Sequence, residues 1–546
     1  MKLYQRVGAL DVEVSATKHT ALDKNNGLDL VLSTGWNTLS GCEVRVKPAS
    51  GGLRLITTES TLLDGEQLGS SFAKPPEAGV FFFGPLEARQ SPTVRFPYTV
   101  ESDLAFVSLK LEVTYNTTSG QTYYLAKFIS VPIALAVGVN VQDVFKHDAL
   151  FSRFSVSTAS SSPLRLFESE LLESELFESY FGVPPSGPVM VFPKQPATLL
   201  YMVKRKPGVK STKRSSKMMY LKLHYSQLHA EIEELVSLSI TKLLEQSDSL
   251  APYARTVRAI VVDYVRSGLD TLDLERAALL GVVATKFLGQ IQWETNLKGL
   301  GVLPDTGEDA GAALATLLNN WQKDHPRLSI PETTLAGKSS ILIPVEIQSV
   351  PVVHTADIRL DPIPQAPFPG APSSDTLDES SAVTPTVAAN QVISATLHLK
   401  WTRIWDTSPP RKDEFLEFSY EVTASPETWL LGGRRKGHFV IPSSTDDESL
   451  LSSTAETEAS IPLILIPQKE GWLPYPSVEI REVSAEADQQ TTTPALEVDW
   501  RNLGETVRVV GGRSGVTVSL DASGPGGGPL VLGVDRVPME GGRVVT

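Results

Sequence analysis

The stretch LKLEVTY at residues 109–115 decides the fold class of this chain. Apolar and polar residues alternate along it, which is typical of a strand with one buried face and one face in water. The same alternation occurs at 9–14 and 42–46, and glycine, proline and asparagine separate the runs. These signals predict that residues 1–139 form an immunoglobulin-like β-sandwich, alone or with part of a preceding one.

Strand signals continue from residue 140, but the period becomes helical after the strand predicted at 220–225. Apolar residues then recur at helical spacing in four successive segments, the third running from about 273 to 291, until alternation returns at 341–347. We therefore expect a second β-sandwich at 140–364 with a helical insertion at about 226–325. The insertion either closes on itself as a small bundle or leaves a groove for a partner helix.

Residues 365–390 are rich in proline, small residues and acids, so they are predicted to be a linker without a core of their own. Alternation resumes at 393–401 and 461–466, which predicts a C-terminal β-sandwich at 391–546. The predicted fold class is mainly β, with tandem immunoglobulin-like β-sandwich domains and an inserted α-helical segment.

The composition limits the classes of function. The 546 residues carry a formal net charge of -14, which disfavours nucleic acid as a partner, because neutralising phosphates requires an excess of Lys and Arg. The single cysteine, Cys42, excludes an intramolecular disulfide and a cysteine zinc site, as expected in a reducing compartment. No segment has the pattern of a signal peptide or a membrane span.

No motif in the sequence predicts catalysis or a cofactor. None of the eight histidines lies at metal-ligand spacing from another ligand. The segment AGKSS at 336–340 resembles the end of a phosphate loop, but the position of the loop's first glycine holds Glu332. We therefore expect a chain that is not an enzyme and that has no catalytic residue, cofactor or metal ion.

Residues 166–181 read LFESELLESELFESYF, a repeat with a five-residue step. With this step the apolar residues do not line up on one face of a helix, and they do not line up on one face of a strand either. We expect either a solvated acidic loop or an acidic-hydrophobic segment that binds a partner.

A basic cluster lies between residues 204 and 217 with no acid among its members. They are Lys204, Arg205, Lys206, Lys210, Lys213, Arg214 and Lys217. One interpretation is a solvated hairpin loop, and another is nucleic-acid binding or nuclear import. The third, which we take as the candidate role, is contact with a partner or an anionic membrane, because each such charge gains about 1 kcal/mol near an anionic bilayer.

Several stretches of the chain resemble a known family. They are GCEVRV at 41–46 with GLRL at 52–55, PTVRFPYTVE at 92–101, LKLHYSQLHAEIEELV at 221–236 and IPLILIPQKEGWLPYPSVEI at 461–480. Together they resemble the C-terminal part of the large TRAPP II vesicle-tethering subunit, the trafficking protein particle complex subunit ten family. The glutamate repeat and the glycine-rich tail depart from that family.

The resemblance implies a non-catalytic scaffold subunit of a TRAPP II-like tethering complex that supports nucleotide exchange on Rab GTPases and vesicle traffic at the Golgi. It implies other TRAPP subunits as partners, a Rab-family GTPase as an indirect partner, and a cytoplasmic location peripheral to trans-Golgi membranes. The alternative is an appendage-like module of a vesicle coat or adaptor that captures peptides or cargo. Stoichiometric partners on co-purification favour the subunit, and micromolar peptide capture favours the appendage.

Overall fold

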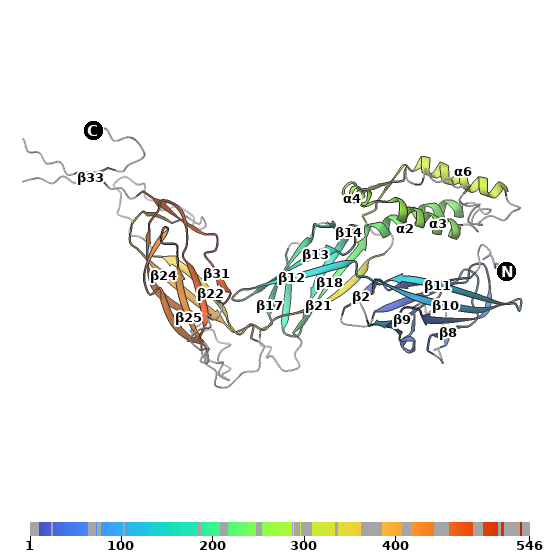
Figure 1. The fold of residues 1–546 in the computed structure, drawn as a ribbon, viewed down its shortest axis with the longest axis horizontal. Coiled ribbons are helices and arrows are strands. Elements are labelled where there is room, and N and C mark those ends of the chain that lie inside the picture. The colour runs from blue at the N-terminus through green and yellow to red at the C-terminus, as the bar shows by residue number, and fades with distance from the viewer. Residues whose placement is uncertain are drawn as a thin grey trace, which may run out of the picture. The chain divides into compact units, whose positions relative to one another are not determined.

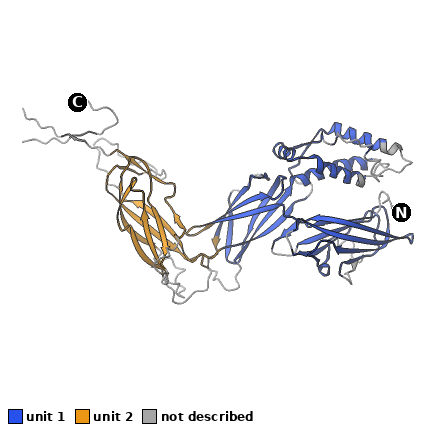
Figure 2. Ribbon diagram, viewed as in Figure 1, with its two compact units in different colours: residues 1–143, 151–203, 216–347 blue, residues 144–150, 204–215, 348–546 orange. Residues whose placement is uncertain are grey.

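The chain forms two compact units, and each is considered by itself (Figure 2). Unit 1 comprises residues 1–143, 151–203 and 216–347, and unit 2 comprises residues 144–150, 204–215 and 348–546. The computed structural model describes residues 10–22, 26–63, 72–73, 78–101, 104–182, 187–207, 217–246, 254–286, 288, 295, 308–332, 337–361, 385–406, 416–441, 458–483, 495–511, 515–517 and 535–537. The predicted fold class is confirmed: the chain is mainly β, with a helical segment in unit 1 (Figure 1).

The first sandwich of unit 1 contains two antiparallel sheets. Its strands are β1 (Asp11–Ala16), β3 (Gly27–Ser33), β4 (Leu39–Pro48), β5 (Leu53–Leu55), β6 (Thr61–Leu62), β7 (Phe72–Ala73), β8 (Val80–Phe83), β9 (Thr93–Val100), β10 (Phe106–Thr117) and β11 (Thr122–Pro132), with a 3-10 helix, η1 (Thr57–Glu59). One sheet has the order β1-β3-β9-β5, with β6 also beside β9, and the other has the order β11-β10-β4-β8-β7.

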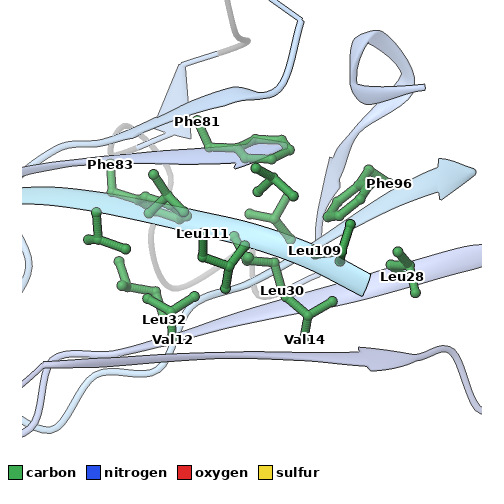
Figure 3. Packing of buried hydrophobic residues seen from close by; sticks show 14 of the residues in the cluster. Val12, Val14, Leu28, Leu30, Leu32, Phe81, Phe83, Phe96, Leu109 and Leu111 are labelled. Atoms are coloured by element: carbon green, nitrogen blue, oxygen red, sulfur yellow. The ribbon is translucent and has the colours of Figure 1, made fainter. Parts of the chain in front are cut away.

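Alternate residues of these strands fill the space between the two sheets. Figure 3 shows Leu30 of one sheet facing Leu109 and Leu111 of the other. Phe81 and Phe96 meet across the core with their ring centroids 5.5 Å apart. The alternation that predicted β10 thus matches its structure, in which alternate residues are buried in the core and the residues between them point outward.

The second sandwich of unit 1 is joined to the first by strand pairing. Its strands are β12 (Val137–Phe145), β13 (Leu150–Thr158), β14 (Leu164–Leu172), β15 (Phe177–Phe181), β16 (Val189–Val191), β17 (Ala197–Arg205), β18 (Met218–Gln227), β21 (Ser339–Glu346) and, from the connection between β1 and β3, β2 (His19–Ala21). The sheet orders are β12-β13-β17-β15 and β16-β14-β18-β21-β2. β2 runs parallel to β21, and His19 Nδ1 lies 2.7 Å from Ser340 Oγ.

The glutamate repeat is not a solvated loop, so that interpretation is wrong. Its first part lies in β14 and its last part in β15, which belong to different sheets. The register of β14 on β18 shifts between Leu166 and Glu168, so the strand is bulged at Phe167. This bulge and the connection between the strands absorb the five-residue step, and both Leu171 and Phe177 are buried.

The helical insertion closes on itself as a bundle with its own core. It contains α2 (Leu228–Glu245), α3 (Ala254–Gly268), α4 (Thr271–Leu280) and α6 (Glu308–Asp324), with the short strands β19 (Val282–Ala284) and β20 (Arg327–Ser329). α4 is shorter than the pattern predicted, because Gly281 is left-handed (φ 66°) and its N–H donates to Ala277 O at 2.9 Å. Val283 lies in β19, and Ile291 lies outside the described residues.

The third sandwich lies in unit 2. Its strands are β22 (Val353–Leu360), β23 (Thr386–Ala388), β24 (Ile393–Thr402), β25 (Leu416–Thr423), β26 (Trp429–Gly433), β27 (Lys436–Ile441), β28 (Glu458–Pro467), β29 (Gly471–Pro474), β30 (Ser477–Glu482), β31 (Val498–Trp500) and β32 (Thr506–Val510). The sheet orders are β26-β28-β24-β22-β31, β23-β32-β29 and β27-β25-β30. β33 (Gly515–Thr517) and β34 (Asp535–Val537) pair with each other.

One strand lies in a different sandwich from the one expected. We assigned 353–360 to the second sandwich, whereas β22 pairs antiparallel with β24 and parallel with β31. Alternation identifies a strand but not its partner, and the predicted linker at 365–390 lies between β22 and the strands with which it pairs. Residues 365–384 of that linker lie outside the described residues, whereas its end forms β23, in which Val387 is buried in the core of the third sandwich, so the expectation of a linker without a core is wrong there.

Candidate interaction surfaces

The basic cluster predicted as a contact site occupies the connection between β17 and β18. This connection is not a hairpin, because β17 pairs with β13 and β15 in one sheet whereas β18 pairs with β14 and β21 in the other. Lys210, Lys213 and Arg214 lie outside the described residues. Lys217 is half-buried just before β18. The described part of the cluster is therefore Lys204 and Arg205 at the end of β17, Lys206 beside them, and Lys217 before β18.

Arg205 has a structural role within unit 2. Its Nη1 donates to the carbonyl of Ile404, and burial lowers the pKa of its guanidinium. Lys204 and Lys206 are not free either, since each has an interaction partner. The cluster thus divides into three side chains with partners, which are Lys204, Arg205 and Lys206, the half-buried Lys217, and three members outside the described residues.

A buried carboxylate organises the same part of unit 2. Asp499 has a fully buried side chain, Lys146 Nζ donates to its Oδ1, and Arg501 Nη2 lies 3.2 Å from its Oδ2. Beside it, the indole Nε1 of Trp405 donates to Lys146 O at 3.2 Å, and the Phe145 ring meets the Trp405 ring edge-on at 5.5 Å. Both oxygens of the Asp499 carboxylate thus lie beside a cation of the same unit, although Oδ2 accepts no hydrogen bond, and the buried charge is compensated within the fold.

A second buried ion pair attaches the helical bundle to the second sandwich. Arg165 on β14 donates to Glu231 Oε2 on α2 at 2.5 Å, and the two side chains are 7% and 4% exposed. The same guanidinium donates to Pro331 O at 2.9 Å and to Glu332 O at 2.7 Å. One side chain therefore joins a strand, a helix and the segment that follows β20.

The bundle leaves an apolar surface on α4. Its own core is closed by residues of all four helices, including Val236, Val261 and Leu318. On α4, however, Leu279 and Leu280 are more than 70% exposed. The observed bundle closes on itself, as the first of the two alternatives predicted.

The motifs weighed in the sequence do not form a metal site among the residues that the structure describes. They contain no group of three or more His, Cys, Asp or Glu side chains placed to hold a metal ion. The serine of the AGKSS segment, Ser340, is hydrogen bonded to His19 within the ladder of β21 and β2. No helix in the described ranges is both long enough and apolar enough to span a bilayer.

The sequence did not reveal the two buried ion pairs. Arg165 and Glu231 are 66 residues apart, and Lys146 and Asp499 are 353 residues apart. Each is an ordinary charged residue in its own segment. Arg165 stands between Leu164 and Leu166, where alternation calls for a polar residue, so no local signal indicated that this position is buried against α2.

Three family models match the chain in succession. A domain of unknown function (DUF7077) matches residues 7–132, a TRS130-like four helical bundle domain matches residues 230–333, and a TRAPPC10 C-terminal domain matches residues 344–510. The bundle model covers most of α2 through to α6, and the C-terminal model begins within the last residues of β21 and includes β22. A comparison with curated proteins finds no match.

Solved structures resemble single parts of the chain. A cohesin module from a family 33 glycoside hydrolase of Clostridium perfringens is 13% identical, with 23% of this chain and 98% of that chain covered and a TM-score of 0.18. A collagen-binding subdomain of the Enterococcus faecalis surface protein ACE is 13% identical, with 22% and 95% covered and a TM-score of 0.18. These TM-scores are too low to transfer a fold or a function.

Proposed function

Because the chain belongs to the TRAPPC10/Trs130 family and carries C-terminal domains of that TRAPP II subunit, we propose that it is a non-catalytic scaffold of the tethering complex. In this role it supports nucleotide exchange on a Rab-family GTPase at Golgi membranes, and the exchange chemistry belongs to other subunits. The observation that carries the proposal is the presence of the bundle domain and the C-terminal domain of this family in one chain.

The construction of the chain is consistent with such a role. β2 pairs the first sandwich with the second, and the Arg165–Glu231 ion pair attaches the bundle to the same sandwich. These contacts hold unit 1 together through backbone ladders and buried charges rather than through a linker. A scaffold requires surfaces held in fixed positions, and unit 1 provides them without an active site among its described residues.

Reconstitution tests the proposal. Co-expression of the chain with the TRAPP core subunits should give one complex of fixed stoichiometry on gel filtration with light scattering. The same complex should accelerate nucleotide release from a Rab-family GTPase, whereas this chain alone should not. A chain that elutes alone at micromolar concentration in the presence of the core subunits would contradict the proposal.

We further propose that the basic cluster contributes to docking on an anionic Golgi membrane. The proposal is supported by the charge of Lys210, Lys213 and Arg214 together with the absence of acids from the segment. Arg205 is not part of this role, because its guanidinium already donates to Ile404 O.

The second candidate function is an appendage-like module that captures peptides. Immunoglobulin-like sandwiches offer sheet edges for this purpose, and β11 and β26 are edge strands in the described sheets. This function predicts reversible binding of short peptides in the micromolar range and no stoichiometric complex with TRAPP subunits.

A further inference from the structure

The outward face of the sheet β11-β10-β4-β8 in the first sandwich carries an unusual set of side chains. Leu109 and Leu111 of β10 point into the core (Figure 3), so the residues between them point outward. On this outward side lie four aromatic and three cationic residues, which we call the aromatic-cationic face: Phe82, Phe106, Tyr124, Phe128, Arg45, Lys47 and Lys110.

The strand register brings these residues together in rows. Phe128 on β11 is opposite Lys110 on β10, which is opposite Lys47 on β4. The Lys110 ammonium lies 6.0 Å from the centroid of the Phe128 ring, within reach of a cation–π contact. Four residues away on β11, Tyr124 begins a row that ends at Phe82 on β8.

The aromatic side chains are exposed to water to an unusual degree. Phe128 is 72% exposed, Tyr124 60%, Phe106 59% and Phe82 36%. The outward face of an antiparallel sheet in a sandwich is normally polar, and gathered exposed aromatic groups mark contact sites. Aromatic residues and arginine are also the types enriched in protein–protein interfaces.

On this face the cationic side chains are more exposed to water than their acidic partners. Lys47, Arg45 and Lys110 are 54%, 49% and 38% exposed, whereas their acidic partners Glu112 and Glu43 are 16% and 28% exposed. Glu112 accepts from both lysines at 2.8 Å, and these hydrogen bonds lower the pKa of its carboxyl to about 2. An approaching partner therefore meets the cations first.

The same sheet ends in a long edge strand. β11 is eleven residues long, and among the described residues no strand pairs with its outer side. Its single charged residue, Lys127, points inward and donates to Asp11 Oδ1 at 3.2 Å. Charges and prolines on an open edge prevent pairing with other chains, and β11 carries them only at Lys127 and Pro132, so its first five residues, Thr122 to Ala126, have neither.

We propose that the aromatic-cationic face is a docking surface for a segment of a partner protein that carries carboxylates beside large apolar side chains. The cations supply charge complementarity to the carboxylates, and the aromatic groups bury the apolar side chains. A continuous polyanion is disfavoured, because Glu43 and Glu112 lie between the cations and the chain has a net charge of -14. The inference does not depend on membership of a tethering complex.

Fluorescence anisotropy of a labelled peptide, EDLFDELFE, titrated with the full chain tests the proposal. We expect micromolar binding that weakens as salt is raised, because exposed ion pairs are screened over about 8 Å at physiological ionic strength. Phe128→Ser with Tyr124→Ser should weaken binding at least tenfold, and so should Lys47→Glu with Lys110→Glu. The thermal unfolding of the aromatic variant should match that of the parent, because both rings are exposed. The lysine reversal places two carboxylates beside Glu112 and should lower the unfolding temperature, so Lys47→Gln with Lys110→Gln, which should also weaken binding, is measured beside it.

Matched controls separate the face from general stickiness. Leu279→Ser with Trp472→Ser removes equally exposed apolar groups elsewhere, and Lys338→Glu with Lys436→Glu reverses two other paired surface lysines. Both controls should bind the peptide as the parent does. A control that weakens binding as much as the face variants would overturn the proposal.

Other outcomes would also overturn it. If a peptide with serine in place of leucine and phenylalanine binds equally well, binding depends on charge alone and not on the aromatic side chains. Tighter binding of phosphatidylserine vesicles or of single-stranded RNA at the same residues would assign the face to a polyanion. A concentration-dependent dimer that Phe128→Ser abolishes in sedimentation would assign it to a second copy of the chain. The co-expression experiment tests the proposed function, and its outcome does not depend on any of these results.

Discussion

His354 on β22 is a titratable residue enclosed by aromatic rings. It is 1% exposed, and neither ring nitrogen has a hydrogen-bond partner. The imidazole lies edge-on to Phe418, with the ring centroids 4.6 Å apart, and edge-on to Phe439 at 5.7 Å. Burial lowers the pKa of His354 from 6.5 to about 4, because the charged form would lose its hydration without gaining a partner.

This pKa shift predicts how the stability of the third sandwich depends on pH. As the pH falls through 6.5 the unfolded chain binds a proton at His354, whereas the folded chain does so only near 4. Stability from this group is therefore complete above pH 6.5 and is lost towards pH 4, by on the order of 3 kcal/mol. His354→Leu should remove this loss, with stability followed by pulse-labelling hydrogen exchange of β22 in urea.

The comparison is made within each protein, between pH 7.5 and pH 4.5, so that a change in packing caused by leucine cancels. Equal losses in parent and variant would show that His354 is not the group responsible.

Cys42 provides a second prediction for a single residue. Its side chain is buried in the first sandwich, and desolvation, with a smaller contribution from Glu43, raises the pKa of the thiol to about 12. Only the thiolate reacts readily with disulfides, so the native chain should be inert to Ellman's reagent at pH 8. One thiol should appear on unfolding in urea. Rapid reaction of the native chain would mean that the first sandwich opens at this position.

Between elements, the Arg165–Glu231 ion pair predicts a large effect on stability. Arg165→Ala leaves the Glu231 carboxylate buried without its cation, and breaking such a pair costs about 3 to 5 kcal/mol. Hydrogen exchange of α2 and β14 should accelerate by roughly 100-fold or more for that change in free energy. The double variant Arg165→Met with Glu231→Leu should restore most of the protection, because a buried pair is replaced by apolar packing.

Arg266→Ala on α3 is the matched control, because it removes the partner of another glutamate on α2. Arg266 donates to Glu233 on α2 at 3.0 Å, but its side chain is 61% exposed, so the loss should stay below about 1 kcal/mol. A similar cost for Arg165→Ala and Arg266→Ala would show that burial does not set the strength of the β14 contact.

The structure of the glutamate repeat predicts that it resists proteolysis, whereas the sequence alone predicts that it is cut early. A solvated acidic loop would be cut early by a glutamate-specific protease, whereas β14 is held between β16 and β18. Native chain should therefore resist cleavage after Glu168 and Glu170, and the same sites should be cut after unfolding in urea. Early cuts after these residues, detected by mass spectrometry, would mean that β14 detaches from the sheet.

How much of the fold could be predicted depends on what the alternation of apolar and polar residues indicates. A period of two marks one buried face, so the strands at 42–46, 109–115 and 461–466 were predicted from local residues. The sheet in which a strand lies depends on distant partners, which is why β22 was placed with the wrong neighbours. The aromatic-cationic face was hidden for the same reason, because Phe128, Lys47 and Phe82 come together through register and not through sequence spacing.

At the scale of the whole molecule, the distribution of charge distinguishes the basic cluster from the rest of the chain. The net charge is -14, yet no acid stands among the seven cations of the cluster, so this segment opposes the field of the molecule. Arg205 donates to a carbonyl, and Lys204 and Lys206 have partners. A test of membrane contact should therefore leave these three residues unchanged and act on the others.

Reversal of Lys210, Lys213 and Arg214 to glutamate should weaken binding of the full chain to phosphatidylserine vesicles. Three charges at about 1 kcal/mol each predict at least a tenfold loss in partition, even if much of the attraction is screened. Raising the salt should weaken the parent more than the variant, because the electrostatic contribution has already been removed from the variant. Thermal unfolding should be unchanged, since the structural contact of Arg205 is retained.

The matched control reverses Arg434, Arg435 and Lys469, which are exposed on the third sandwich and change the net charge by the same amount. Vesicle sedimentation that shows equal losses for both triple variants would attribute the effect to net charge and would exclude a docking role for the cluster.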